Sequence, residues 1–150
     1  MNKAGIAGWC LYDWANSAFT TVVTTFIFSV YFTGKVAADK VAGTSQWSLA
    51  IAAAGFAILV LSPALGAIAD RTGRRKPWLA LFTALSVAAT ASLWHVRPDP
   101  AWVPFALVAV VVASIAYELA GVFYNAMLID LAPPGHMGRV SGWGWGVGYF

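Results

Sequence analysis

Four long apolar stretches dominate the sequence, at about residues 14–34, 47–69, 78–94 and 102–129. About 20 apolar residues in a helix cross the hydrocarbon core of a bilayer, which is about 30 Å thick. None of the stretches alternates between apolar and polar residues, as the strands of a membrane barrel do. Because lipid offers the backbone no hydrogen bonds, each stretch has to satisfy its own backbone groups as a helix. We therefore predict an all-helical membrane protein with these four spans.

The composition and the end of the chain extend this prediction. Hydrophobic residues make up 60% of the chain and charged residues 10%, whereas soluble proteins carry about 25% charged residues. The final ten residues, 141–150, are also uncharged. We expect a fifth span to begin at about residue 141, and we expect the chain to be the N-terminal part of a longer protein.

The basic residues predict the orientation in the membrane. With the N-terminus in the cytoplasm, the inner segments hold Lys3, Arg71, Arg74, Arg75, Lys76 and Arg139, and the outer loops hold Lys35, Lys40 and Arg97. An excess of basic residues marks the cytoplasmic side. The net charge of +3 is therefore an orientation signal, and we expect no nucleic-acid partner. The predicted location is the inner membrane of a cell with the N-terminus cytoplasmic, or the vacuolar membrane in a fungus.

The inner loop between the second and third stretches has a distinctive spacing. It reads Gly66-Ala-Ile-Ala-Asp70-Arg71-Thr-Gly73-Arg74-Arg75-Lys76. A loop that only sets topology explains its basic residues but not this spacing. The loop resembles the signature loop of the major facilitator superfamily and follows the second span, as it does in that family. The resemblance implies a twelve-span transporter, in which Gly66, Asp70, Arg71, Gly73 and Arg74 have gating roles and stabilise one state against the opposite half of the protein.

A second resemblance concerns one branch of that superfamily. Residues 11–19, Leu-Tyr-Asp-Trp-Ala-Asn-Ser-Ala-Phe, resemble the opening of the vacuole effluxer-like branch. Residues 125–131 and 138–149 resemble further stretches of the same branch. A fungal member of the branch is a vacuolar amino-acid effluxer. The resemblance implies a small solute as substrate, with an amino acid as one candidate.

The polar side chains of the first predicted helix fall on one side at 100° per residue. They are Asp13, Asn16, Ser17, Thr20 and Thr24, with Tyr31 on the same side. Lipid-facing positions avoid such groups, so the stripe should face protein or a water-filled cavity. Two alternatives stay open: the hydroxyls bond to their own or a neighbouring helix, and Asp13 is a helix N-cap.

The fourth stretch contains one deeply placed acid, Glu118. Facing lipid at the bilayer centre would cost it at least about 2.5–3.5 kcal/mol, so we expect it to face the interior. Ser114, Glu118 and Asn125 share a helix face, beside Tyr117. In the superfamily, helices one and four line the central cavity, so the resemblance implies that both polar faces form the substrate and proton pathway. Glu118 is the candidate for proton coupling or for binding a substrate amine, and a structural hydrogen bond to a neighbouring helix is the alternative.

These observations predict a secondary active transporter that moves a small molecule by alternating access, coupled to protons through Glu118 or Asp13. We expect no cofactor and no metal, since His95 and His136 lie in opposite loops and do not make a metal site, and no enzyme motif is present. The expected partners are the small-molecule substrate, protons, the lipid bilayer and the C-terminal half of the same protein. Two alternatives remain, a membrane-embedded enzyme and a non-transporting membrane scaffold subunit.

Overall fold

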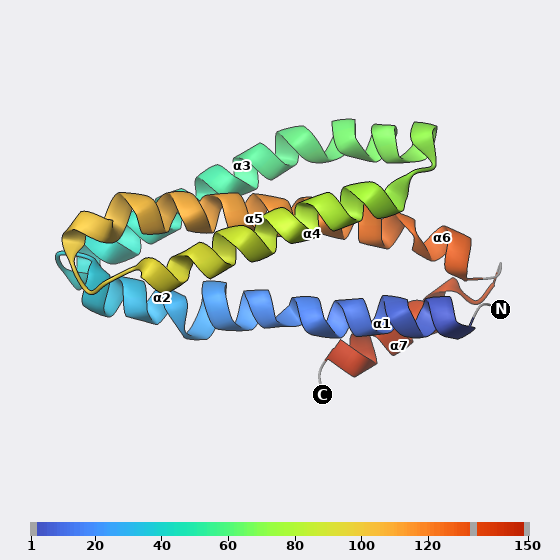
Figure 1. The fold of residues 1–150 in the computed structure, drawn as a ribbon, viewed down its shortest axis with the longest axis horizontal. Helices are drawn as coiled ribbons and strands as arrows, with labels where there is room; N and C mark the ends of the chain where they lie inside the picture. Colours follow the sequence, from blue (N-terminus) through green and yellow to red (C-terminus); the bar gives the residue numbers. More distant parts are fainter. Residues whose placement is uncertain (1–2, 133–134, 149–150) are drawn as a thin grey trace.

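The computed structural model describes residues 3–132 and 135–148, and every regular element within these ranges is a helix. Four helical segments, Lys3–Val36, Lys40–Thr72, Arg75–His95 and Pro100–Leu131, are long and apolar enough to cross a membrane. They run lengthwise through the molecule (Figure 1). The predicted all-helical membrane fold is confirmed. We name the end that holds residues 73–76 the inner end, after the predicted orientation, and the opposite end the outer end.

The first segment changes its helix type along its length. It consists of α1 (Lys3–Ala18), the π-helix η1 (Phe19–Phe26), α2 (Phe28–Tyr31) and the π-helix η2 (Phe32–Val36). In the π-helices each N–H bonds to the carbonyl five residues earlier, as Ile27 N does to Val22 O at 3.2 Å. The helix begins well before the apolar stretch that starts at residue 14. Asp13 therefore lies inside α1, and the alternative that it caps the helix is wrong.

The second segment, α3 (Lys40–Thr72), is bounded by two local signals. At its start the Asp39 carboxylate accepts hydrogen bonds from the N–H groups of Val41 and Ala42, at 2.9 and 2.8 Å. This cap reduces the outer loop, predicted over residues 35–45, to residues 37–39. At its end Gly73 takes the left-handed conformation, with φ of 61°, which glycine adopts without steric cost.

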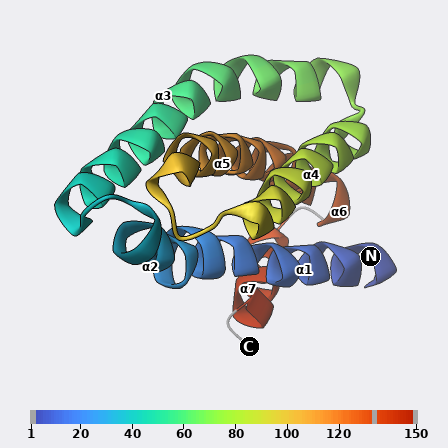
Figure 2. The ribbon, with the colours of Figure 1, turned by 60° about the vertical axis from the view of Figure 1, so that its left-hand side comes forward.

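The course of α3 is bent rather than straight (Figure 2). Pro63 lies inside this helix. A proline in a helix interior donates no backbone hydrogen bond, and its ring crowds the preceding turn, so it bends the helix. Pro63 therefore gives a physical reason for the bend of α3.

The remaining elements enclose α5 (Val103–Ala126), which lies at the centre of the bundle (Figure 2). Before it come α4 (Arg75–Ser92) and the 3-10 turns η3 (Leu93–His95) and η4 (Pro100–Trp102). Helix α5 contacts both α3 and α4. Many of its buried residues are small, and these are Ala106, Ala109, Ala113, Ala116 and Ala120. Small side chains let helix backbones approach closely in a membrane protein.

The chain continues into α6 (Leu128–Leu131) and α7 (Met137–Gly148). Helix α7 packs against α1 at the inner end (Figure 1). Helix α7 begins at Met137, ahead of the expected start of a fifth span at about residue 141, and residues 149 and 150 lie outside the described part of the chain. The fifth span itself stays a prediction. Two clusters of buried residues hold the bundle together, one near each end. The outer cluster centres on Phe32 and Val110, and the inner one on Trp9 and Tyr124.

Candidate functional site

A pocket of about 740 Å³ lies between the first helical segment, α3 and α5. Its polar lining comes from Thr20 and Thr24 on η1, Ser48 on α3, and Ser114, Tyr117 and Glu118 on α5. The remaining walls are aromatic or apolar and come from Phe19, Trp47, Ile51, Ala52, Ala54, Gly55 and Ile58. Five of the residues singled out from the sequence therefore meet around one space. They come from two helices whose positions in the chain are about 90 residues apart.

The α5 side of the pocket carries its charge. Glu118 is exposed to the pocket, and one turn earlier Ser114 is only 8% exposed. The Ser114 hydroxyl has no hydrogen-bond partner among the described residues. Between them, the Tyr117 ring stacks on Phe19 of η1 with ring centroids 4.8 Å apart. This contact joins the two helices at the height of the pocket.

The hydroxyls of the first segment are engaged within their own helix. Ser17 donates to the Trp14 carbonyl at 2.7 Å, Thr20 to the Ser17 carbonyl at 3.0 Å, and Thr24 to the Thr20 carbonyl at 2.8 Å. These three hydroxyls therefore donate to carbonyls of their own helix, which was one of the alternatives left open by the sequence. Thr20 and Thr24 still line the pocket, so their oxygen atoms can accept further hydrogen bonds there.

The other residues predicted for the pathway, Asp13, Asn16, Ser17 and Asn125, do not line this pocket. Asn16 lines a separate pocket of about 410 Å³ between the first segment and α4, together with Thr83 and Thr90. Asp13 lies on α1 closer to the inner end than Asn16 does, and its carboxylate interacts electrostatically with Tyr124 of α5. Asn125 is exposed near the inner end of α5.

An aromatic cluster at the inner end was not singled out from the sequence. The Trp9 ring stacks on Tyr124 with centroids 4.4 Å apart and 7° between the ring planes, and its indole N–H donates to the Tyr124 carbonyl at 3.1 Å. Tyr12 stacks on the same tyrosine at 5.2 Å, and its hydroxyl shares a 2.7 Å hydrogen bond with Thr83 of α4. These contacts tie α1 to α4 and α5. No local pattern marks them, because the partners are far apart in the chain.

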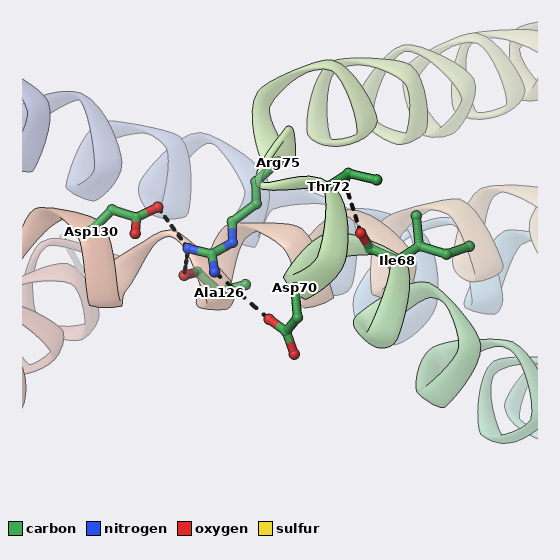
Figure 3. Close-up of polar contacts among 6 residues, drawn as sticks. All are labelled: Ile68, Asp70, Thr72, Arg75, Ala126 and Asp130. Atoms are coloured by element: carbon green, nitrogen blue, oxygen red, sulfur yellow. Dashed lines mark hydrogen bonds and ion pairs between the residues drawn. The ribbon is translucent and has the colours of Figure 1, made fainter.

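The predicted gating loop is organised by Arg75, the first residue of α4 (Figure 3). Its guanidinium lies 2.6 Å from the Asp130 carboxylate and donates to the Ala126 carbonyl at 2.8 Å. A longer ion pair of 3.7 Å reaches Asp70. Arg75 thus links the end of α3 to the end of the fourth segment, and the sequence argument did not include it or Asp130 among the candidate residues.

The other residues of that loop differ in their surroundings. Asp70, Arg71 and Arg74 are exposed. Gly73 is required by its positive φ. Gly66 has open space where a side chain would project, so within this chain no neighbouring backbone depends on its small size.

Comparison with known proteins identifies the family of this chain. Residues 3–150 match the Major Facilitator Superfamily. The chain belongs to this superfamily. It is also 38% identical over 144 residues to the uncharacterized MFS-type transporter YxiO of Bacillus subtilis (strain 168), which covers 94% of this chain and 33% of that protein. The chain therefore spans about a third of the length of the curated relative it matches. No solved structure matches it.

Membership of the major facilitator superfamily settles the coarser predictions. The chain is part of a multi-pass membrane protein of a transporter family, and the family points away from an enzyme. The resemblance of the loop at residues 66–76 to the superfamily signature led to the correct family. The assignment to the vacuole effluxer-like branch stays a prediction.

Proposed function

We propose that the complete protein is a secondary active transporter that moves a small solute across a membrane by alternating access. The single observation that carries this proposal is the pocket between the first segment, α3 and α5. It brings a carboxylate, four hydroxyls and a phenol together between helices whose other pocket-lining residues are mostly apolar. Polar groups in a membrane-spanning helix are costly unless they face protein or water, and they mark substrate and ion pathways. The pocket is this chain's share of the proposed site.

We also propose that Glu118 couples transport to protons. Glu118 and the Tyr117 phenol are the titratable groups among the described residues that line the pocket. A carboxylate with no cation beside it in a membrane cavity can bind and release a proton as its exposure to water changes. Asp13 is the second candidate, since it lies on the same helix as Thr20 but closer to the inner end.

The loop at residues 66–76 is proposed to gate this cycle. Asp70, Arg71 and Arg74 are exposed at the inner end, where a second half of the protein could contact them. Gly66 and Gly73 would keep the loop close to that half. The Arg75–Asp130 ion pair holds the loop against the fourth segment, so the contact would be presented by a fixed surface.

The finer assignments of substrate and location are proposals of the same kind. We propose the vacuole effluxer-like branch, an amino acid as candidate substrate, and the C-terminal half of the same protein as the structural partner. The proposed orientation has the N-terminus in the cytoplasm and the inner membrane as location. It is supported by the position of the Arg71–Lys76 cluster at the same end of the molecule as the N-terminus (Figure 1).

The test is flux in proteoliposomes that contain the full-length protein, with labelled amino acids supplied one at a time. We expect a pH gradient to drive accumulation in the wild type. Glu118→Gln should lose this dependence on the gradient and keep solute exchange at saturating concentration. Asp99→Asn removes one carboxylate at the outer turn, where asparagine retains the capping hydrogen bond to Ala101 N, and should behave as the wild type. Unaltered pH dependence in Glu118→Gln would refute the coupling role, and absence of flux for every solute would favour the scaffold alternative.

A further inference from the structure

We propose that the pocket selects solutes that carry an ammonium group on an apolar body, with the ammonium held by Glu118 and Ser114. This inference rests on the proposed transport function and specifies its substrate class. Three independent features of the pocket support it: the sign of its charge, an unused buried hydroxyl, and the aromatic rings beside them.

The charge of the lining is of one sign. Glu118 is an acid, and no lysine, arginine or histidine is among the described residues that line the pocket. Glu118 is exposed to the pocket, and an ionised carboxylate within a membrane-spanning segment is stabilised when it pairs with an opposite charge. A solute ammonium would supply that opposite charge and donate hydrogen bonds to the Glu118 carboxylate. The described walls offer no cation to a solute carboxylate, so the carboxylate of an amino acid would have to be bound outside them.

The Ser114 hydroxyl is the second feature. It is 8% exposed, lines the pocket, and has no hydrogen-bond partner among the described residues. The other buried serine of the core, Ser86 on α4, is similarly enclosed at 7% exposure but donates to the Ala113 carbonyl at 3.2 Å. Buried polar groups in native proteins are nearly always satisfied. A ligand ammonium beside Glu118 would donate to the Ser114 oxygen one helical turn away, which would satisfy this group.

The aromatic rings are the third feature. Phe19 and Tyr117 stack on each other next to Glu118, and Trp47 lines the same pocket from α3. The face of an aromatic ring attracts a cation within about 6 Å of its centroid. Ile51 and Ile58 of α3 also line the pocket, and they would accommodate the apolar part of the solute. Protons and the solute ammonium would then compete for one carboxylate.

The experiment compares three probes that share a phenyl ring and differ in their polar end. Titration calorimetry on the detergent-purified full-length protein at pH 7 would measure binding of 2-phenylethylamine, 3-phenylpropanoate and 2-phenylethanol. We expect the amine to bind at least about tenfold more tightly than the other two, equivalent to about 1.4 kcal/mol. Glu118→Gln should remove this preference, and Asp99→Asn should retain it.

A second variant, Ser114→Ala, distinguishes a role of this serine in binding from a role in folding. It removes a buried hydroxyl that has no partner, so the thermal stability of the protein should be unchanged or raised. Affinity for 2-phenylethylamine should nevertheless fall by about threefold to tenfold. A structural role for this serine would give the opposite pair of results, a loss of stability with affinity unchanged.

Several outcomes would overturn the proposed ammonium site. These are equal or tighter binding of the carboxylate or alcohol probe, an unchanged amine preference in Glu118→Gln, and no binding of the amine at millimolar concentration. Flux of a solute without an ammonium group, together with any of these outcomes, would leave the transport proposal standing. Tight amine binding without flux of any solute would instead refute transport and leave the ammonium site standing.

Discussion

The contact between Gly144 and Trp9 gives the sharpest test of the packing of α7 on α1. A β-carbon added at Gly144 would lie 2.5 Å from Cζ3 of Trp9 and 3.2 Å from its Cη2. The indole has little freedom to move, because its other face stacks on Tyr124, its N–H is bonded to the Tyr124 carbonyl, and it is 7% exposed. Gly144→Ala should therefore force a local shift of α7.

The size of the effect follows from two opposing contributions. Overpacking a rigid site costs about 1–3 kcal/mol, while replacing glycine by alanine inside a helix gains about 0.5–1 kcal/mol. Gly142 and Gly146, two residues to either side in α7, have nothing within 4 Å of an added β-carbon. Gly142→Ala and Gly146→Ala should then be neutral or stabilising in this chain, and Gly144→Ala should be less stable than either by about 1–3 kcal/mol.

Equilibrium unfolding in mixed detergent, followed by tryptophan fluorescence, would measure these differences. Combining Gly144→Ala with Trp9→Leu completes a double-mutant cycle, and the double variant should recover much of the lost stability because the smaller side chain can give way. If Gly144→Ala were as stable as Gly142→Ala, the close packing of Trp9 on α7 would be refuted.

Two further predictions concern the ends of the helices. Arg75→Ala should destabilise the protein by about 1–2 kcal/mol, since it removes charge-assisted hydrogen bonds to the exposed Asp130 carboxylate and to the Ala126 carbonyl. Arg74→Ala, at an exposed position, should change the free energy of unfolding by less than about 0.5 kcal/mol. Equal effects of the two variants in a thermal unfolding assay would contradict the role assigned to Arg75. Asp39→Ala should lower the free energy of unfolding by about 0.5–2 kcal/mol because it removes the cap of α3, and Asp39→Asn should be nearly neutral. Faster amide hydrogen exchange at the start of α3 would show that this end frays. Unchanged protection from exchange in the alanine variant would count against the cap.

The helices and the family could be predicted because their signals are local. Runs of apolar residues define a membrane helix by length alone, and the loop at residues 66–76 carries the spacing that resembles the superfamily signature. The helix boundaries were harder to predict from the sequence. Residues 3–13 continue the first helix before the predicted start at residue 14, since their backbone hydrogen bonds extend the same helix. The Asp39 cap starts α3 earlier than the apolar pattern suggested.

The candidate site was predicted in part, and distance along the helix explains the difference. Ser114, Tyr117 and Glu118 lie within about one turn and reach the pocket together. Asn125 shares the helix face of Ser114, but eleven residues place it about 16 Å further along the axis, near the inner end. A helical wheel shows which face of the helix a residue lies on, but it does not show the position of the residue along the helix axis.

Contacts between distant segments could not be predicted at all. The stacking of Trp9 on Tyr124 joins residues 115 positions apart, and the Arg75–Asp130 ion pair joins residues 55 positions apart. Each partner alone is an unremarkable aromatic or charged residue near a span end. Only the packing of α5 between the first segment, α3 and α4 selects these pairs.

The short connection at residues 37–39 constrains how the first two membrane helices can rearrange. Four α-carbon steps from Val36 to Lys40 span at most about 14 Å, and Trp47 packs on Phe28 and Phe32 across the junction. The two helices stay joined at this end and diverge away from it (Figure 2). Their separation can therefore widen only by pivoting about the outer junction, which would open the wall of the pocket toward the opposite side of the bilayer.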